Sequence, residues 1–506
     1  MDSQYTHKTA SALKWRRLAY GLVALAFATY VALIAIRVGA HAGGSDSSGY
    51  FNNARLLRQG VVKIPQRALP DLPPEKLSAF SYISLGFRPV DGSSMAPTYP
   101  TGLPILFAAA SVIAGWDAGP HWIIGIHTVL GVLLVFGLGR QCGLSREFAA
   151  LGALIVGISP LYLFFGLQAM SDVPALVWVT GAVVLAWHSR TRPGLLTPLA
   201  AGAVFAMAVL VRPTNIIAIA PIAIALGLDW RRWIPFGFGG LPFAIFLAIY
   251  NRAAYGDALA SGYGNVSYLM KADVVGETLV HYGQWFPVLL TPLVVLVLGL
   301  PWIARSASRW TAILITWIAG FAAFYAFYTV TRETWWSLRF LLPAFPALAV
   351  ASLLVLQRIF SKITRRLTRQ IAGGVTAAAV LCWSIAWGDH FYALNMGRDE
   401  GVYREAAEWA RENLPEDAVV VSMQTSGTVI YYTDFVILRW DQLTPENAAA
   451  VTANLEANNR PLFAILFPHE VKDVVEKRLL GDWKEIGAVR HVTIWRQESA
   501  TVASEN

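Results

Sequence analysis

Two aspartates stand where the chain leaves one apolar segment or enters another. Asp46 lies in the stretch GGSDSSGYFNNARLLRQG, directly after an apolar segment long enough to cross a membrane, and Asp172 lies in QAMSDVPAL, directly before a second such segment. A carboxylate can accept the proton of a hydroxyl nucleophile, so each aspartate could act as a general base. Each could instead cap a helix, because aspartate is favoured at helix N-caps and Pro174 suits a helix start.

Three arginines are expected at the same membrane level as these aspartates. They are Arg212 in LVRPTN, and Arg332 and Arg339 in TRETWWSLRFLLPAFP. A guanidinium matches the oxygens of a phosphate, and near lipid such contacts are poorly screened. Arginines beside apolar segments also snorkel harmlessly to the interface, and Arg332, next to Glu333, fits that alternative. Together, the carboxylates and guanidiniums indicate an anionic substrate that is linked to a lipid.

The composition places these residues in a polytopic membrane protein. The 506 residues are 56% hydrophobic and 14% charged, include 19 tryptophans and have a mean hydropathy of +0.49. The net charge of +8 does not indicate a nucleic-acid partner, because the basic residues collect between alternate apolar segments. The two cysteines, Cys142 and Cys382, form no pair suited to a disulfide on the outer side.

Eleven apolar windows of about twenty residues, the length that a bilayer core requires, recur along the chain. Arg212-Pro213 separates two of them, because proline ends one helix and suits the first turn of the next. The predicted spans are 17–37, 120–139, 147–168, 172–188, 195–211, 214–229, 233–251, 285–303, 310–329, 339–356 and 371–388.

The loops rich in arginine and lysine all fall on the side of the N-terminus, and such loops stay cytoplasmic. We therefore expect a multi-pass protein of the cytoplasmic (inner) membrane with a cytoplasmic N-terminus. The transmembrane domain covers residues 1–388, with an outer loop at 38–119. Residues 389–506 read as a small extracytoplasmic α/β domain, since REAAEWARENL and PENAAAVTANLEANN have helical spacing and AVVVSM and PLFAILF read as buried strands.

The outer loop contains two segments that could shape a cavity against the bilayer. Tyr50, Ala54 and Leu57 share one face of a helix that begins at Asp46, which predicts an amphipathic helix on the outer membrane surface. The segment PTYPTGLPILFAAASVIAG at 97–115 is too short and too rich in proline for a span, so a re-entrant or surface helix is expected there.

The order of these motifs resembles that of the GT-C membrane glycosyltransferases, and within them the group of protein mannosyltransferases, aminoarabinose transferases and lipopolysaccharide-core sugar transferases. The resemblance covers most of residues 17–356 and rests on the Asp46 stretch, PTYPTGLP, SDVPAL, LVRPTN, YNRAAYGDALASGYG and LRFLLPAFPALAV. It implies inverting transfer of a sugar from a polyprenyl-phosphate donor to an acceptor hydroxyl outside the cytoplasmic membrane, in the assembly of a cell-envelope glycan or lipid.

By this resemblance Asp46 would be the base on the acceptor hydroxyl, and Asp172 would orient the acceptor or assist. Arg212 and Arg339 would contact the donor phosphate. The predicted substrate-binding set is completed by Arg332, Tyr50, Tyr99 and His281. Several relatives carry a basic residue or histidine before the prolines of the short outer helix, where this chain has Tyr99-Pro100-Thr101-Gly102.

The sequence contains no glycine-rich phosphate loop after a strand, no CxxC or HExxH motif and no nucleophile elbow. No metal ligand and no cofactor are predicted. The two aspartates could hold a divalent metal ion, but a single base acting on a hydroxyl does not require one.

Two alternatives from other classes stay open. One is a secondary transporter or a flippase of a lipid-linked or anionic substrate, although no internal repeat is visible and the charges cluster at one membrane face instead of mid-span. The other is that the C-terminal domain is the working part and the spans only anchor it, although one helix would suffice as an anchor.

Overall fold

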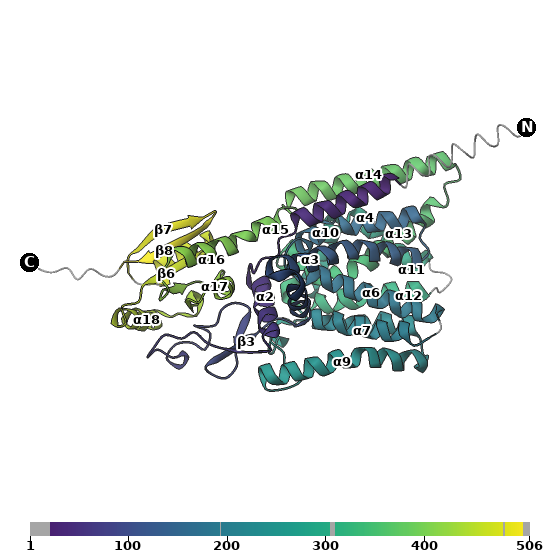
Figure 1. The fold of residues 1–506 in the computed structure, drawn as a ribbon. Helices are drawn as coiled ribbons and strands as arrows, with labels where there is room; N and C mark the ends of the chain where they lie inside the picture. Colours follow the sequence, from purple (N-terminus) through teal and green to yellow (C-terminus); the bar gives the residue numbers. More distant parts are fainter. Residues whose placement is uncertain (1–20, 193, 304–308, 479–480, 499–506) are drawn as a thin grey trace, which may run out of the picture.

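The computed structural model describes residues 21–192, 194–303, 309–478 and 481–498. Long helices form a bundle on one side of the molecule, and strands with short helices form its other side (Figure 1). Helix α2 (Ser45–Arg58) lies between the two parts. The first residues of the predicted span 17–37 and the last residues of the predicted domain 389–506 fall outside the described residues.

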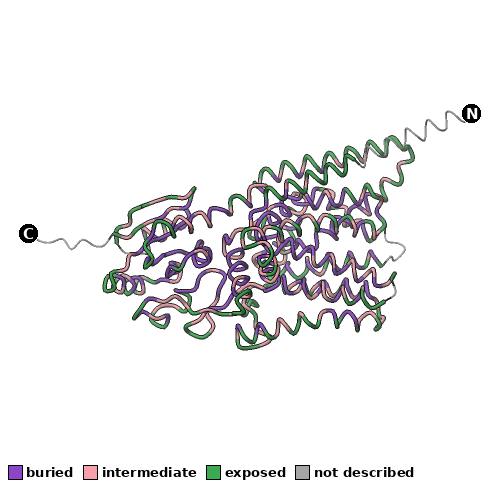
Figure 2. Tube along the Cα trace, viewed as in Figure 1, coloured by how far each residue is buried: buried purple, intermediate pink, exposed green. Residues whose placement is uncertain are grey.

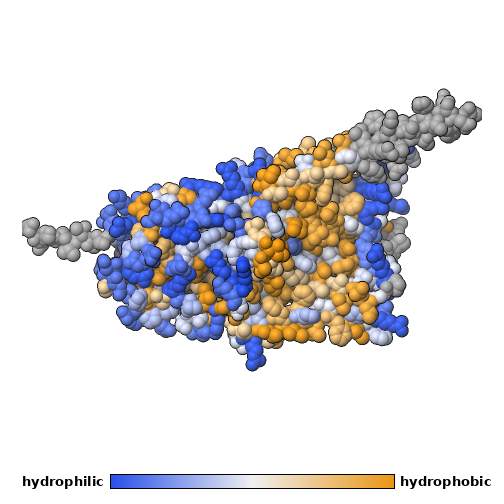
Figure 3. All heavy atoms as spheres, viewed as in Figure 1, coloured by the Kyte–Doolittle hydropathy of each residue, from blue (hydrophilic) through white to orange (hydrophobic). Residues whose placement is uncertain are grey.

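The bundle has an apolar belt that matches a bilayer. Figure 3 shows hydrophobic residues over the sides of the helices and hydrophilic residues at both ends. Within the described residues, six helices are long and apolar enough to cross a membrane, or up to eight if each of two bent pairs is one span, and three further apolar helices are shorter. The helices are Gly21–Arg37, α3 (Gly102–Gln141), α4 (Arg146–Gly157), α5 (Pro160–Gly166), α6 (Asp172–Thr191), α7 (Leu196–Val211), α8 (Ile219–Leu226), α9 (Trp230–Tyr255), α10 (Val275–Leu290), α11 (Leu300–Ile303), α12 (Arg309–Ala326), α13 (Phe345–Phe360) and α14 (Arg366–His390).

Breaks in these helices fall at glycine and proline. Helix α7 ends at Val211, and a 3-10 helix begins at Pro213 (Pro213–Ala218), so the predicted break at Arg212-Pro213 is confirmed. The predicted short outer helix is the first part of α3, which kinks at Gly115 with φ 76° and ψ 175°. A side chain with a Cβ disfavours that φ, and the kink separates the outer helix from the predicted span 120–139.

The predicted span at 285–303 is not one straight helix. Helix α10 begins ten residues earlier, at Val275, and the chain bends by 118° before the 3-10 helix Pro292–Gly299 and α11. Pro292 lacks an N–H donor and restricts the residue before it, and Thr291 takes a positive φ of 70° at the bend. Hydropathy recorded the apolar run correctly but not its change of direction.

Residues beyond α14 form a mixed sheet with the strand order β5-β4-β6-β8-β7 among the described residues. Strand β4 (Val419–Val421) pairs in parallel with β5 (Val436–Leu438) and β6 (Leu462–Leu466). Strand β6 pairs antiparallel with β8 (Val492–Gln497), and β8 pairs antiparallel with β7 (Trp483–Val489) at the edge of the sheet. The α-helices that follow α14 in this part of the chain are α15 (Met396–Asp399), α16 (Gly401–Asn413), α17 (Ser426–Tyr432), α18 (Pro445–Ala457) and α19 (Pro468–Asp473).

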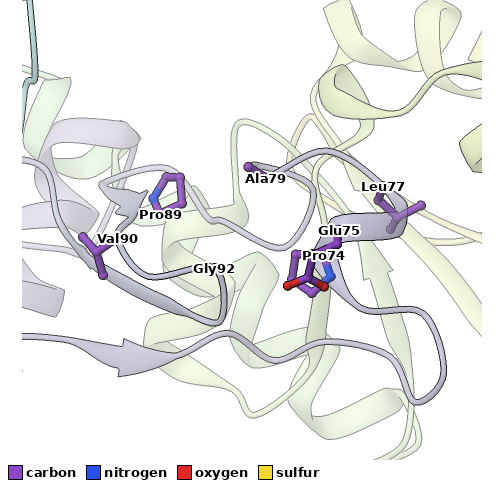
Figure 4. Close-up of a pocket in the computed structure, with 7 residues that line it drawn as sticks. All are labelled: Pro74, Glu75, Leu77, Ala79, Pro89, Val90 and Gly92. Carbon is purple, nitrogen blue, oxygen red and sulfur yellow. The ribbon is translucent and has the colours of Figure 1, made fainter.

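The outer loop adds a small antiparallel sheet of β1 (Ile64–Pro65), β3 (Ser94–Pro97) and β2 (Phe87–Pro89). A cavity of about 280 Å³ lies beside it, lined by loop residues from Pro74 to Gly92 (Figure 4). Its lining includes none of the predicted site residues. This cavity therefore takes no part in the site described below.

Candidate active site

Four of the predicted site residues meet in two acid–arginine pairs. Arg339 Nη1 donates to Asp46 Oδ2 at 2.9 Å, and Arg212 Nη2 donates to Asp172 Oδ1 at 2.5 Å. The pairs adjoin, since Arg212 Nη1 lies 3.5 Å from the main-chain oxygen of Arg339. Residues from four separate segments of the chain thus form one charged cluster where the bundle meets α2.

Helix α2 carries Asp46 in its first turn and is held from two sides. Residues Ser47 to Ala54 are buried on every face of the helix, and Asn52 donates to the main-chain oxygen of Gly427 in α17 at 2.9 Å. An amphipathic surface helix would expose its polar face, whereas α2 is buried on that face as well (Figure 2). Residues beyond α14, including α17, cover the polar face of α2, which the sequence pattern predicted to face water and lipid headgroups.

Close backbone packing fixes α2 in place. A Cβ on Gly49 would come within 2.3 Å of the Tyr99 ring, and one on Gly86, which has a φ of +88°, would come within 2.6 Å of the Gly49 Cα. Only glycine fits at such approaches. The start of α2, which carries Asp46, and the loop before α3 are therefore locked together, which fixes the position of the carboxylate.

The arginines are placed by breaks in the bundle. Arg212 follows α7 in an extended conformation, with a φ of −153°, and this turns its side chain from the helix toward the first turn of α6. Arg339 lies in the 3-10 helix Trp335–Ala344, and its guanidinium lies 5.4 Å from the ring centre of Phe165 and 5.2 Å from that of Phe340. Aromatic faces attract a cation, which partly offsets its loss of water.

The two aspartates differ in burial. The Asp172 side chain has no exposed surface, whereas those of Asp46 and Arg339 are 22% and 17% exposed. Asp46 is therefore accessible from outside the protein, whereas the fully buried Asp172 is paired with Arg212. Asp172 Oδ2 and Arg339 Nε have no hydrogen-bond partner among the described residues, so each can accept or donate one more bond.

Neither aspartate is a helix cap. The N-cap residues of α2 and α6 are Gly44 and Ser171, and neither makes a side-chain capping bond within the described part of the chain. The capping alternative is therefore set aside for Asp46 and Asp172, whose carboxylates bind arginines instead.

The predicted tyrosines line the cluster. Tyr50 donates to Ser171 Oγ at 2.8 Å, the Tyr99 and Ser45 hydroxyls lie 2.6 Å apart, and the two tyrosine rings are 5.4 Å apart. Burial, and then the charge of Asp46, raises the pKa of both tyrosines above the usual range, so both hydroxyls stay neutral and able to donate. Tyr263, from the loop after α9, lies against Tyr99 with ring centres 6.0 Å apart and was not predicted.

Two predicted substrate-binding residues are engaged elsewhere. Arg332 forms an ion pair with Glu277, and the two side chains are 37% and 67% exposed. His281 Nε2 lies 3.1 Å from the main-chain oxygen of Thr334 and its ring packs near Trp285. The structure therefore does not bring Arg332 or His281 into the charged cluster.

The arrangement does not favour a resident metal ion. Both aspartates already bind arginines, and the described residues contain no group of three or more His, Cys, Asp or Glu side chains that could hold a metal. A divalent ion prefers several oxygen ligands, and here it would share the carboxylates with two arginines. A carboxylate that takes the proton of a hydroxyl does not itself require a metal.

Glu400 is a further acidic residue beside the site that the sequence did not indicate. The Gly44 N–H donates to Glu400 Oε2 at 3.3 Å, two residues before Asp46. Burial raises the pKa of Glu400 to about 7; the bond from Gly44 opposes this shift and the charge of Asp46 adds to it. The second part of the molecule thus contributes a titratable group to the turn that carries Asp46.

Glu400 gives stability a specific pH dependence. The unfolded chain releases this proton near pH 4.3 and the folded chain near pH 7, so stability falls as the pH rises across that window. Glu400→Gln stays neutral, so its apparent melting temperature should exceed that of the wild type by a few degrees at pH 8 and match it at pH 5. Glu412→Gln, at an exposed position of α16, is the control. If the melting temperature of Glu400→Gln changed between pH 5 and pH 8 as much as that of the wild type, Glu400 would not be the group that gives this pH dependence.

Comparison with known proteins establishes the fold. No family model and no curated protein sequence matches the chain. Among solved structures, ArnT (aminoarabinose transferase) from Cupriavidus metallidurans bound to undecaprenyl phosphate is 12% identical, over 96% of this chain and 100% of that chain, with a TM-score of 0.57. Its apo state is 12% identical, over 95% of this chain and 98% of that chain, with a TM-score of 0.58.

Arabinofuranosyltransferase AftD from Mycobacteria is 13% identical over 94% of this chain, with a TM-score of 0.52, and the match covers 40% of that longer chain. The chain is therefore a multi-pass membrane protein with the GT-C fold of these glycosyltransferases. At this level of identity the likeness establishes the fold, and the chemistry has to be argued from the site.

Proposed function

We propose that the protein is an inverting glycosyltransferase that moves a sugar from a polyprenyl-phosphate donor to an acceptor hydroxyl at the outer face of the cytoplasmic membrane. The observation that carries this proposal is the pair of Asp46 and Arg339, which is partly exposed and adjoins the buried pair of Asp172 and Arg212. A base and a phosphate-binding cation lie within one hydrogen bond of each other, which is the arrangement that such a transfer needs.

In the proposed step the acceptor hydroxyl attacks the anomeric carbon of the donor sugar. The new bond joins the acceptor oxygen to that carbon, the bond from the carbon to the phosphate oxygen breaks with its electron pair, and polyprenyl phosphate leaves. Asp46 takes the hydroxyl proton. Arg339 and Arg212 stabilise the charge on the leaving phosphate, and attack from the opposite side inverts the anomeric centre.

The structure of ArnT with undecaprenyl phosphate supports a polyprenyl-phosphate donor, because that protein has the same fold over nearly its whole length. Tyr50 and Tyr99, which stay neutral, would donate to sugar or phosphate oxygens. The acceptor would be a lipid or a glycan of the cell envelope, and the sugar a hexose or a pentose.

We propose the following membrane topology. The three shorter apolar helices and the bent pairs would each be a span, which gives eleven spans with a cytoplasmic N-terminus. Residues 389–506 would form an extracytoplasmic α/β domain that closes over the site, since Thr428 of α17 donates to the main-chain oxygens of Ala42 and Gly43. The domain supports a site that the bundle supplies, so the spans are more than an anchor.

The transporter or flippase alternative needs charges along a path through the bilayer. Here the charged cluster lies at one end of the bundle, at the start of α6 and α2. A general base paired with a phosphate-binding arginine accounts for a charged cluster at one end of the bundle. A transport path across the membrane does not.

The test is transfer by purified protein in liposomes. We would supply radiolabelled polyprenyl-phosphate sugars carrying a hexose, a pentose or an aminopentose, together with envelope lipids and glycans as acceptors. A covalent labelled product that forms only with protein is the expected result. Movement of label across the membrane without any covalent product would instead support the transporter.

A further inference from the structure

A second cavity, of about 800 Å³, opens at the end of the bundle opposite to Asp46. Its walls come from the end of α3, the turn into α4, the end of α13 and the first half of α14 (Figure 1). Helix α13 runs from the segment of Arg339 to this cavity, and its 16 residues span about 24 Å at 1.5 Å per residue. The cavity is therefore separate from the candidate active site.

Charged groups at one end of this cavity are mostly positive. They are Arg140, Arg366 and Arg369, with Glu147 as the one acidic side chain. Arg140 donates to the main-chain oxygen of Leu144, which holds its guanidinium at the mouth. The side chains of Arg366 and Arg369 are exposed and have no ion-pair partner among the residues that the structure describes.

The polar wall between these charges is rigid. Gln357 at the end of α13 accepts from the Ser145 N–H at 2.7 Å and donates to the main-chain oxygen of Gly143 at 3.2 Å. The Ser145 side chain in turn caps α4 by accepting from the Phe148 N–H. The cavity is thus a formed feature of the turn between α3 and α4, with the N-terminus of α4 beside it, and a helix N-terminus also favours an anion.

The rest of the cavity is an apolar groove along α14. Phe148, Leu151, Phe360 and Ala377 line it, and α14 faces outward over most of its length (Figure 2). Two adjacent glycines, at 373 and 374, leave it open, because a Cβ at either position would meet no atom within 4 Å. An occupant therefore finds a cationic end followed by an apolar channel at the level of the bilayer.

We propose that this cavity binds an anionic phospholipid of the membrane leaflet on that side, with the headgroup phosphate on Arg366 and Arg369 and an acyl chain in the groove beside Gly374. A small soluble anion would use only the cationic end, and a neutral lipid only the groove. Basic pockets between membrane helices recognise anionic headgroups through these two features together. The proposal does not depend on the transferase activity.

The experiment is a titration of the purified full chain in detergent with short-chain phosphatidylglycerol and, separately, short-chain phosphatidylcholine, with binding read from the shift in melting temperature. Phosphatidylglycerol should bind more tightly to the wild type, and the preference should shrink at high salt. Arg366→Gln combined with Arg369→Gln should weaken phosphatidylglycerol binding about tenfold or more. Gly374→Leu should weaken it without any change of charge, because the side chain fills the groove.

The matched control removes the same charge from the same end of the bundle outside the cavity. Arg192→Gln combined with Arg231→Gln does this, since both side chains are exposed at the end of α6 and the start of α9. This variant should bind phosphatidylglycerol like the wild type. Equal weakening in both double variants, equal binding of the two lipids, or wild-type binding by Gly374→Leu would each overturn the proposal.

Discussion

Asp46→Asn should lower the rate of sugar transfer by about a hundredfold to ten-thousandfold, because the amide cannot take the proton of the acceptor hydroxyl. Its affinity for polyprenyl phosphate should stay the same or rise. Without substrate, Arg339 Nη1 lies 2.9 Å from Asp46 Oδ2. Loss of the Asp46 charge weakens this ion pair, so the guanidinium is freer to bind a phosphate. The measurements are initial rates with a radiolabelled donor and direct binding of polyprenyl phosphate.

A matched control exists on the same protein. Glu277 pairs with Arg332 as Asp46 pairs with Arg339, but the Glu277 side chain is 67% exposed, and exposed pairs contribute little. Glu277→Gln should therefore keep both the rate and the affinity. If Asp46→Asn lost binding and rate together, Asp46 would be a structural partner of Arg339; if it kept the wild-type rate, the proposed base would be wrong.

The residues that could be predicted from the sequence share a local anomaly. Asp172, Arg212 and Arg339 each carry a charge at the edge of an apolar segment, where such a group is costly without a partner. The free-energy cost of an unpaired charge at such a position indicated that each residue has a partner. The structure pairs Asp172 with Arg212 and Asp46 with Arg339. Arg332 showed the same anomaly but pairs with Glu277 outside the cluster, which only the three-dimensional course of the loops could reveal.

Features that depend on burial by a distant segment of the chain could not be predicted from the sequence. The face of Tyr50, Ala54 and Leu57 was correctly seen as apolar, but a pattern within α2 cannot show that α17 packs on the opposite face. Glu400 gave no signal either, since it lies in a polar stretch after the last span and reaches Gly44 only through the fold. Packing between segments far apart in the sequence determines both the burial of α2 and the position of Glu400, and local helix propensity does not.

Asp172→Ala is expected to destabilise the folded protein by about 3–5 kcal/mol, because it leaves the Arg212 guanidinium buried without its counter-charge. The Asp172 side chain is fully buried and that of Arg212 is 12% exposed, so water cannot replace the lost partner. The measurement is the apparent melting temperature of the purified protein in detergent. Wild-type stability in Asp172→Ala would show that the pair does not hold this part of the bundle together.

A second variant separates the fold from the chemistry. Asp172→Ala combined with Arg212→Met removes both charges, and replacing a buried ion pair by apolar side chains is often close to neutral for stability. The double variant should therefore regain most of the lost melting temperature. Its transfer should remain impaired by about tenfold or more, because the donor phosphate loses the charged bonds from Arg212 while Asp46 and Arg339 remain in place. Recovery of both stability and transfer would exclude Arg212 from the donor site and leave Arg339 as the phosphate ligand.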